Sequence, residues 1–123
     1  MTSGSGKVRF DQQERVAVVT VSGEMDLHDL TEVVDGFAQA LSDAATDATL
    51  IDLSGVTFAD SVFLNQLLVT YTGHGVKGRP LTVCGPLHAS LRRLLELTGT
   101  DTVLPLATDR RDALLRLRMA DPT

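Results

Sequence analysis

Short apolar runs and longer apolar stripes alternate along the chain, and they predict two kinds of element. Runs rich in β-branched residues, bounded by polar or glycine-containing segments, predict strands. The predicted strands are residues 8–10, 15–21, 50–53, 80–84 and 102–106. Residues 16–19 are apolar throughout, as in a strand covered on both faces, and Pro105 places the last strand at an edge of the sheet.

Four stripes of apolar residues at spacings of three and four positions predict helices. The stripes comprise Leu27, Leu30, Val33, Val34, Phe37, Ala38 and Leu41; Phe63, Leu64, Leu67, Leu68 and Tyr71; Leu87, Leu91, Leu94 and Leu95; and Ala113, Leu114 and Leu117. Asp26 or Asp29 is available as the N-cap of the first helix, and residues 60–61 are good starters for the second. Pro86 is expected in the first turn of the third helix, with Gly99 beyond its end.

The resulting order, ββαβαβαβα, predicts a single α/β domain. Strands that alternate with helices call for right-handed crossovers and a mostly parallel sheet, whereas the first strand pairs antiparallel with the second. A chain of 123 residues is long enough for one ordinary domain with its own core. We expect a flexible N-terminus at residues 1–7, the domain at residues 8–118 and a C-terminal tail at residues 119–123.

Charge and cysteine content argue against several classes of protein. The net charge of −5 disfavours direct binding to nucleic acid, which requires clustered Lys and Arg. Cys84 is the only cysteine, so no intrachain disulfide can form and a cytoplasmic location fits. No apolar run approaches the roughly 20 residues that cross a bilayer, and residues 1–7 lack the order of a signal peptide, so we expect no membrane segment.

Ser61 is a candidate for chemistry because it follows a buried strand and begins a helix. Free amide groups and the helix dipole favour an anion there, so a phosphate on Ser61 could be held. The same spacing fits a simple capping role for Asp60 and Ser61, and spacing alone favours that role. Asp26 ends a neighbouring strand-to-helix passage and is expected at the same edge as Asp60. Asp52, inside a strand, is a candidate for holding a loop backbone.

The remaining reactive side chains give no sign of a catalytic or metal centre. His28, His74 and His88 are scattered, without cysteines or carboxylates at metal-ligand spacing, and we expect them at the surface. Cys84 lies in a strand and is better explained as a small core residue than as a nucleophile. The motifs of serine hydrolases, dinucleotide-binding folds and P-loops are missing. We therefore expect no enzyme activity, cofactor, metal or small-molecule substrate.

Three segments occur in order along the chain: VVTVSGEMD at residues 18–26, LIDLSGVTFADS at residues 50–61 and LRRLLELTG at residues 91–99. Together they resemble the STAS domain family, the fold of bacterial anti-sigma factor antagonists, over about residues 8–118. The resemblance implies a cytoplasmic, non-enzymatic regulator of transcription that acts through protein–protein contact. In that family the unphosphorylated antagonist captures an anti-sigma factor and frees a sigma factor.

The resemblance also implies roles for individual residues. Ser61 matches the serine that the anti-sigma factor, a serine kinase, phosphorylates, and Asp26 and Asp60 match acids beside it. A phosphatase, expected to be of the PP2C type, restores the unmodified form. The expected partner-binding residues are Asp26, Asp60, Ser61, Val62 and Phe63. The family usually has a small residue and a glycine after this serine, whereas Val62 and Phe63 follow it here. Phe63 is therefore expected either in the core or as an apolar spot on that surface.

Two other functions compete with this interpretation. A STAS module that serves only as a scaffold would bind partners regardless of the state of Ser61. A phosphoacceptor of the receiver type would gather Asp26, Asp52 and Asp60 around a magnesium ion. Such a pocket also needs a lysine near the end of a late strand, and the only lysines, Lys7 and Lys77, are poorly placed.

Overall fold

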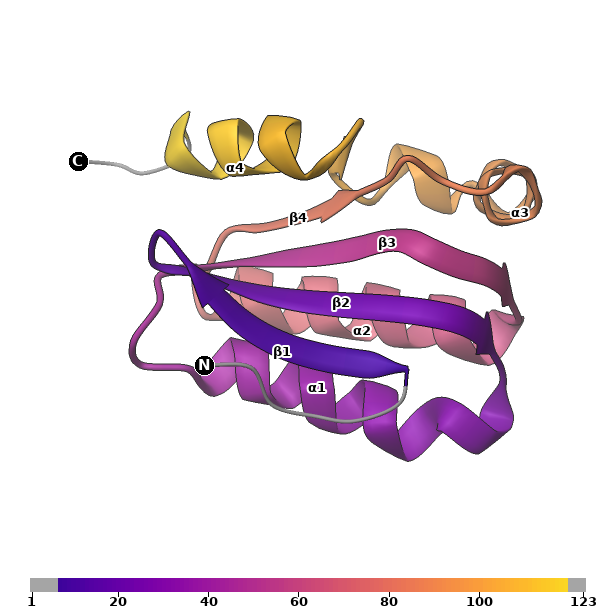
Figure 1. Ribbon diagram of the computed structural model, residues 1–123, viewed down its shortest axis with the longest axis horizontal. Coiled ribbons are helices and arrows are strands. Elements are labelled where there is room, and N and C mark those ends of the chain that lie inside the picture. Colours follow the sequence, from indigo (N-terminus) through magenta and orange to yellow (C-terminus); the bar gives the residue numbers. More distant parts are fainter. Residues whose placement is uncertain (1–6, 120–123) are drawn as a thin grey trace.

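The computed structural model describes residues 7–119, which form one mixed sheet covered by helices (Figure 1). The strands are β1 (Val8–Gln13), β2 (Val16–Met25), β3 (Ala48–Ala59), β4 (Leu81–Cys84) and β5 (Leu106–Ala107). The helices are α1 (Leu30–Ser42), α2 (Ser61–Val76), α3 (Ala89–Thr98) and α4 (Arg110–Met119), with short 3₁₀ helices η1 (Leu27–Asp29) and η2 (Thr100–Thr102). The strand order is β1-β2-β3-β4-β5; β1 is antiparallel to β2, and the other pairs are parallel. The predicted α/β class, sheet and element order are confirmed.

The first three strands are longer than the sequence pattern predicts. β1 continues to Gln13, so the hairpin turn consists of Glu14 and Arg15 alone, both at positive φ. β3 continues to Ala59, and the predicted end of this strand at residue 53 is wrong. A Cβ on Gly55 would lie 2.8 Å from the Cβ of Ser22 on β2, so glycine here permits the close approach of two strands.

The segment from β4 to β5 departs from the prediction in two places. The strand predicted at residues 102–106 is wrong in extent, because η2 occupies its start and β5 comprises only two residues. β5 is an edge strand, as Pro105 indicates. Pro86 lies in the loop before α3, which begins at Ala89, so its predicted place in the first turn is also wrong. Gly99 ends α3 in the left-handed conformation, at φ 75°, as expected.

The sheet separates two layers of helices and two clusters of buried side chains. α1 and α2 lie along one face of the sheet and α4 lies along the other (Figure 1). Val19, Ile51 and Val83 join the larger cluster, which also contains buried residues of α1, α2 and α3. Val18 and Leu50, each one position earlier on its strand, join the smaller cluster under α4. This alternation explains why β2, β3 and β4 are apolar at consecutive positions.

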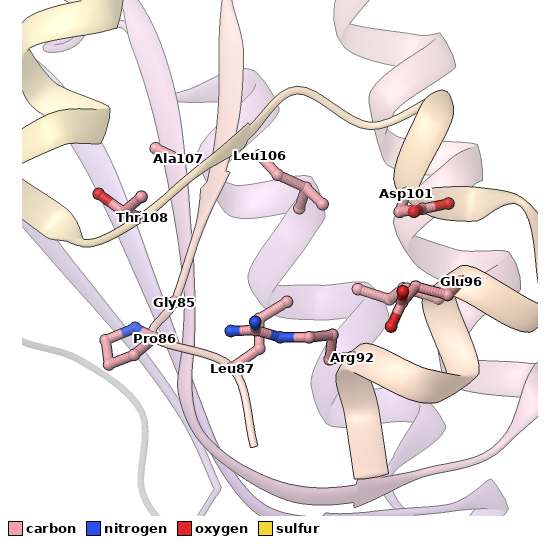
Figure 2. A pocket seen from close by; sticks show the side chains of 10 residues that line it. Gly85, Pro86, Leu87, Arg92, Glu96, Asp101, Leu106, Ala107 and Thr108 are labelled. Carbon is pink, nitrogen blue, oxygen red and sulfur yellow. The ribbon is translucent and has the colours of Figure 1, made fainter. Parts of the chain in front are cut away.

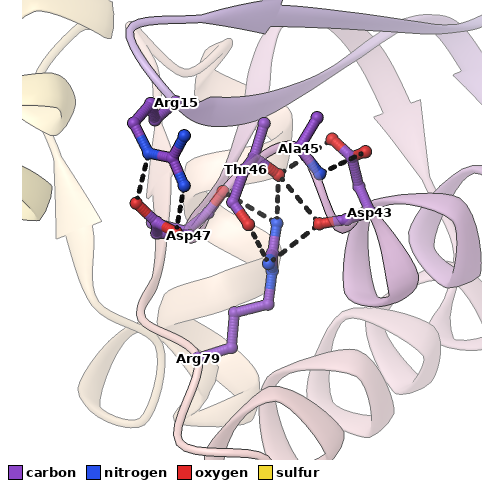
Figure 3. Close-up of polar contacts among 7 residues, drawn as sticks. Arg15, Asp43, Ala45, Thr46, Asp47 and Arg79 are labelled. Atoms are coloured by element: carbon purple, nitrogen blue, oxygen red, sulfur yellow. Dashed lines mark hydrogen bonds and ion pairs between the residues drawn. The ribbon is translucent and has the colours of Figure 1, made fainter.

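Two arginines secure the α1–β3 loop at the edge of the sheet opposite Ser61 (Figure 3). Arg79 Nη1 donates a hydrogen bond to the carbonyl oxygen of Thr46 at 2.8 Å, and Nε donates to Thr49 Oγ1 at 3.2 Å. Arg15 Nε donates to Asp47 Oδ2 at 2.7 Å. The bond to Thr46 satisfies a backbone carbonyl that the loop would otherwise leave without a partner, and the other two bonds tie the arginines to side chains of Thr49 and Asp47.

One histidine is placed differently from the prediction. His74 is buried on α2, with 1% of its surface exposed, so its expected surface position is wrong. Its Nδ1 lies 2.6 Å from the carbonyl oxygen of Thr70, and its Nε2 lies 2.9 Å from Thr49 Oγ1. His28 and His88 are exposed as expected. The hydrogen-bond partners Thr70 and Thr49 explain how the imidazole of His74 is accommodated in an apolar layer.

Cys84 and the chain ends complete the comparison with the sequence. Cys84 is buried under α4, as predicted, and burial raises the pKa of its thiol to about 12. The predicted N-terminal segment and tail lie mostly outside the described residues. Lys7 is described, and its Nζ donates to the carbonyl oxygen of Glu24 at 2.6 Å. Within residues 7–119, no helix is long and apolar enough to cross a bilayer.

Candidate functional site

The ends of β2 and β3 bring two of the predicted acids to one edge of the sheet. Met25 pairs with Ala59 in the parallel ladder, and each is followed directly by an aspartate. The backbone N–H of Asp60 donates to the carbonyl oxygen of Met25 at 3.2 Å. Asp26 and Asp60 therefore follow paired strand residues, as expected for the carboxyl ends of neighbouring parallel strands.

Asp60 is the N-cap of α2. Its Oδ1 accepts hydrogen bonds from the backbone N–H groups of Val62 and Phe63, each at 3.1 Å. Ser61 is the first residue of α2; it is exposed, and its hydroxyl has no hydrogen-bond partner within the described part of the chain. Two amide groups that could have held a phosphate on Ser61 are thus already occupied by Asp60. The capping role inferred from spacing is real, and it leaves the hydroxyl open to other molecules.

Asp26 caps η1 and is part of a reciprocal arrangement. Its Oδ1 accepts from the backbone N–H of His28 at 2.9 Å, and its own N–H donates to Asp29 Oδ2 at 3.0 Å. The hydrogen bond from the Asp26 amide, helped by Lys7 at 3.2 Å, lowers the pKa of Asp29 against the opposing effect of its partial burial. The side chain of Asp26 remains 50% exposed, so its carboxylate borders the open surface near Ser61.

Of the two residues that follow Ser61, one faces the core and one lies at its boundary. Phe63 is 3% exposed and belongs to the larger buried cluster. Of its two expected positions, the core and the surface, the structure shows the core. A side chain buried to this extent offers a partner almost no contact area, and its expected contact with a partner stays a prediction. Val62 is half-buried and lies beside the serine.

The same edge of the sheet carries two exposed apolar side chains that the sequence did not single out. Leu27 in η1 is 63% exposed, and Phe58 near the end of β3 is 51% exposed. The sequence pattern places Leu27 in the apolar stripe of the first helix, but Leu27 lies in η1, directly after the Asp26 cap and ahead of α1, and so outside that stripe. Exposed apolar groups beside polar ones are typical of protein-binding surfaces.

Asp52 belongs to a separate arrangement on the α4 side of the sheet. Its side chain is 8% exposed; Oδ1 accepts from the backbone N–H of Ser54 at 2.9 Å, and Oδ2 accepts from Arg110 Nη2 at 2.8 Å. Burial raises the pKa of Asp52, but the Ser54 amide and the Arg110 guanidinium together lower it below its ordinary value. Asp52 thus holds the backbone of its own strand at Ser54, inside β3, so the loop expected from the sequence is corrected, and Arg110 is the partner that the sequence did not reveal.

The structure does not assemble the acidic pocket that the receiver-type alternative requires. Among the described residues, no three His, Cys, Asp or Glu side chains lie close enough together to hold a metal ion. Asp52 is paired with Arg110, while Asp26 and Asp60 cap helices at the carboxyl edge of the sheet. The geometry therefore supports a binding surface around Ser61.

The chain is a small α/β domain with a mixed sheet. Its candidate site is centred on an exposed serine, Ser61, at the start of α2. A family model described as "Mlab, STAS domain" matches residues 8–107, and the chain belongs to the STAS domain family. The resemblance inferred from the three sequence segments is confirmed.

Similar proteins carry names that agree with this assignment. The anti-sigma F factor antagonist of Paenibacillus polymyxa is 25% identical over 113 residues, covering 92% of this chain and 96% of that protein. The crystal structure of an anti-sigma factor antagonist from Mycobacterium paratuberculosis has a TM-score of 0.80 and 33% identity, with 91% and 93% of the two chains covered. The phosphorylated form of the Bacillus cell fate determinant SpoIIAA, at 16% identity and a TM-score of 0.66, covers 90% of this chain and 99% of its own and shares the fold.

Proposed function

We propose that this chain is an anti-sigma factor antagonist that acts in the bacterial cytoplasm. In its unmodified form it binds an anti-sigma factor and so releases a sigma factor. The names of the similar proteins and the coverage of nearly the whole chain support this proposal. We further propose that the anti-sigma factor is a serine kinase that modifies Ser61 and that a PP2C-type phosphatase reverses the modification.

The observation that carries the switch is the position of Ser61 directly after its capping aspartate. The hydroxyl is exposed on the first turn of α2, where a kinase can reach it without unfolding the domain. Because Asp60 already accepts from the amides of Val62 and Phe63, a phosphate on Ser61 must displace that cap or project outward. An outward phosphate occupies the space that a bound partner would fill.

Charge repulsion adds to this steric effect. A phosphoserine carries about −1.5 to −2 charges at neutral pH. If the phosphate carries two negative charges and lies about 6 Å from one carboxylate, their repulsion costs roughly 1.4 kcal/mol in water and more at a dry interface. A coupling of about 1–3 kcal/mol changes affinity about 5- to 150-fold, so the switch requires no change of fold.

The surface around Ser61 suggests what the partner presents. Leu27 and Phe58 offer exposed apolar contacts, and the carboxylates of Asp26 and Asp60 border the serine. We propose that the anti-sigma factor covers the apolar groups and places basic side chains near the carboxylates. Val62, half-buried, lies at the edge of this contact, and Phe63 supports it from the core.

Labelling with radioactive ATP in native cytosol tests the switch directly. We expect label on the wild-type chain, loss of label in Ser61→Ala, and removal of label by a PP2C-type phosphatase. Ser90→Ala is the matched control, because Ser90 is an exposed serine on the same edge whose hydroxyl donates to the carbonyl oxygen of Thr57 at 2.8 Å. Label that persists in Ser61→Ala would reject Ser61 as the site. Binding of a partner irrespective of Ser61 would support the scaffold function instead.

A further inference from the structure

A pocket of about 440 Å³ lies at the carboxyl ends of β4 and β5, apart from the surface around Ser61 (Figure 2). Its walls come from three parts of the chain: the loop after β4, the side of α3 that carries the exposed Arg92 and Glu96 together with η2, and β5 with the residue that follows it. The volume lies within the range of small-molecule sites.

The topology of the sheet explains why an opening forms there. The helix after β4, α3, contributes Leu91 and Leu95 to the larger buried cluster, whereas the helix after β5, α4, contributes Ala113 and Leu117 to the smaller one. The chain therefore leaves two adjacent parallel strands toward opposite faces of the sheet. In open α/β sheets such a divergence creates a crevice outside the carboxyl ends of the strands, and ligands bind in such crevices.

The apolar wall of the pocket is built into the loop after β4. Pro86 and Leu87 line one side, and Leu106 lies opposite, on β5 (Figure 2). A Cβ on Gly85 would collide with the backbone nitrogen of Leu87, so glycine allows this loop to turn tightly beside the pocket. These surfaces suit the apolar body of a small molecule.

The charged groups of the pocket carry both signs and are unused by the protein. Arg92 extends from α3 along the pocket towards Leu87, while Glu96 and Asp101 lie near each other on the side of α3 and η2 (Figure 2). None of these three side chains has a hydrogen-bond or ion-pair partner among the described residues, although Arg92 and Glu96 are one helical turn apart.

We propose that this pocket binds a small zwitterion with an apolar body, of the chemical class of an apolar α-amino acid. Arg92 pairs with the carboxylate of the ligand, Glu96 and Asp101 receive its ammonium group, and the leucine and proline side chains cover its apolar part. The two carboxylates repel polyanions such as nucleotides, and the guanidinium repels simple amines. The mixture of charges thus selects against ligands that carry only one sign.

The test compares three probes that share one apolar group. L-Phenylalanine carries both charges, 3-phenylpropionate lacks the ammonium group, and phenethylamine lacks the carboxylate. Titration into the ¹⁵N-labelled protein, followed by NMR, should show saturable shifts of the amides of Gly85 and Leu87 and of residues 92–96 and 106–108 with L-phenylalanine. We expect 3-phenylpropionate and phenethylamine to bind at least about tenfold more weakly. Absence of saturable shifts at 10 mM L-phenylalanine, or tighter binding of either single-charge probe, overturns the proposal.

A matched pair of variants separates the pocket from general charge effects. Arg92→Gln should weaken L-phenylalanine binding at least about tenfold. Arg93→Gln removes the same charge from the next residue of α3, which is exposed and does not line the pocket, and should leave the dissociation constant within about twofold. The double variant Glu96→Gln with Asp101→Asn should abolish the preference for L-phenylalanine over 3-phenylpropionate. Equal weakening by the two arginine variants, or an unchanged preference in the double variant, contradicts the assigned roles.

Discussion

Asp60 Oδ1 accepts a hydrogen bond from the backbone N–H of Phe63 at 3.1 Å. The residue that caps α2 therefore also positions Phe63, the first buried side chain of that helix. Ser61 lies between these two residues, with its hydroxyl outward and without a hydrogen-bond partner in the described part of the chain. The buried Phe63 side chain and the Asp60 cap hold the backbone around Ser61 in place. A modification of this serine therefore acts on a prearranged surface.

Replacing the cap tests how much of the local order depends on it. Asp60→Ala should lower the free energy of unfolding by about 0.5–2 kcal/mol, because two amide groups of the first turn lose their acceptor. Asp60→Asn is the control, since asparagine is an equally good N-cap and removes only the charge. Urea denaturation measures both variants. Equal losses in the two would contradict a capping role and indicate a role for the charge.

Variants of Phe63 test whether its side chain stabilises the fold or contacts the partner. Phe63→Ala should lower the free energy of unfolding by about 3–5 kcal/mol, because the side chain is 3% exposed within the larger cluster. The milder Phe63→Leu should cost about 1 kcal/mol and leave partner affinity within about twofold. Val62→Ala, at the half-buried neighbour, is the comparison. A loss below about 1 kcal/mol in Phe63→Ala would contradict its placement in the core.

The ion pair between Asp52 and Arg110 should affect how the free energy of unfolding falls at acid pH. Arg110→Met leaves a carboxylate of 8% exposed surface without its cation and should cost about 1–3 kcal/mol near neutral pH. Because the pKa of Asp52 is lowered in the folded state, its contribution is present above the unfolded pKa of about 3.9 and is lost as pH falls through the folded pKa.

The control for that pair is Arg111→Met, which removes a neighbouring exposed arginine. Chemical denaturation from pH 7 to pH 2.5 should show a smaller acid-dependent loss for Arg110→Met than for wild type, and Arg111→Met should follow wild type. Identical profiles for both variants would contradict the assigned pairing.

His74 predicts a second pH dependence, at higher pH. Burial and the nearby positive charge of Arg79 lower the pKa of His74, although its hydrogen bond to the carbonyl oxygen of Thr70 opposes the shift. The unfolded chain therefore binds a proton more readily, and stability should fall as pH drops below about 6.5, by at most about 1.4 kcal/mol per pH unit. His74→Gln should flatten this slope between pH 7.5 and pH 5, and His88→Gln should not. A slope that survives in His74→Gln would refute this assignment.

Local patterns in the sequence predicted the element order and the parallel sheet because burial leaves a direct mark on apolar spacing. They failed where contacts between distant residues override local preference. Gly55 continues a strand because β2 approaches it closely at Ser22, and His74 is buried because Thr49 supplies a partner 25 positions away. Neither contact leaves a signal in its own segment.

The candidate site shows the same division. Asp26 and Asp60 were predicted at one edge because both follow parallel strands, and the pairing of Met25 with Ala59 places them there. The burial of Phe63 could not be distinguished from exposure, because an aromatic residue in the first helical turn fits either face. The role of each residue toward a partner stays a prediction.

The most direct test of the central claim is a titration of one purified anti-sigma factor, captured from native cytosol by the unmodified chain, against three forms of this protein. Calorimetry gives the dissociation constants for the unmodified form, for the form phosphorylated at Ser61, and for Ser61→Ala. We predict that phosphorylation weakens binding at least about tenfold, near 1.4 kcal/mol, whereas Ser61→Ala binds like the unmodified chain. Equal dissociation constants within about twofold for the unmodified and phosphorylated forms would contradict the switch.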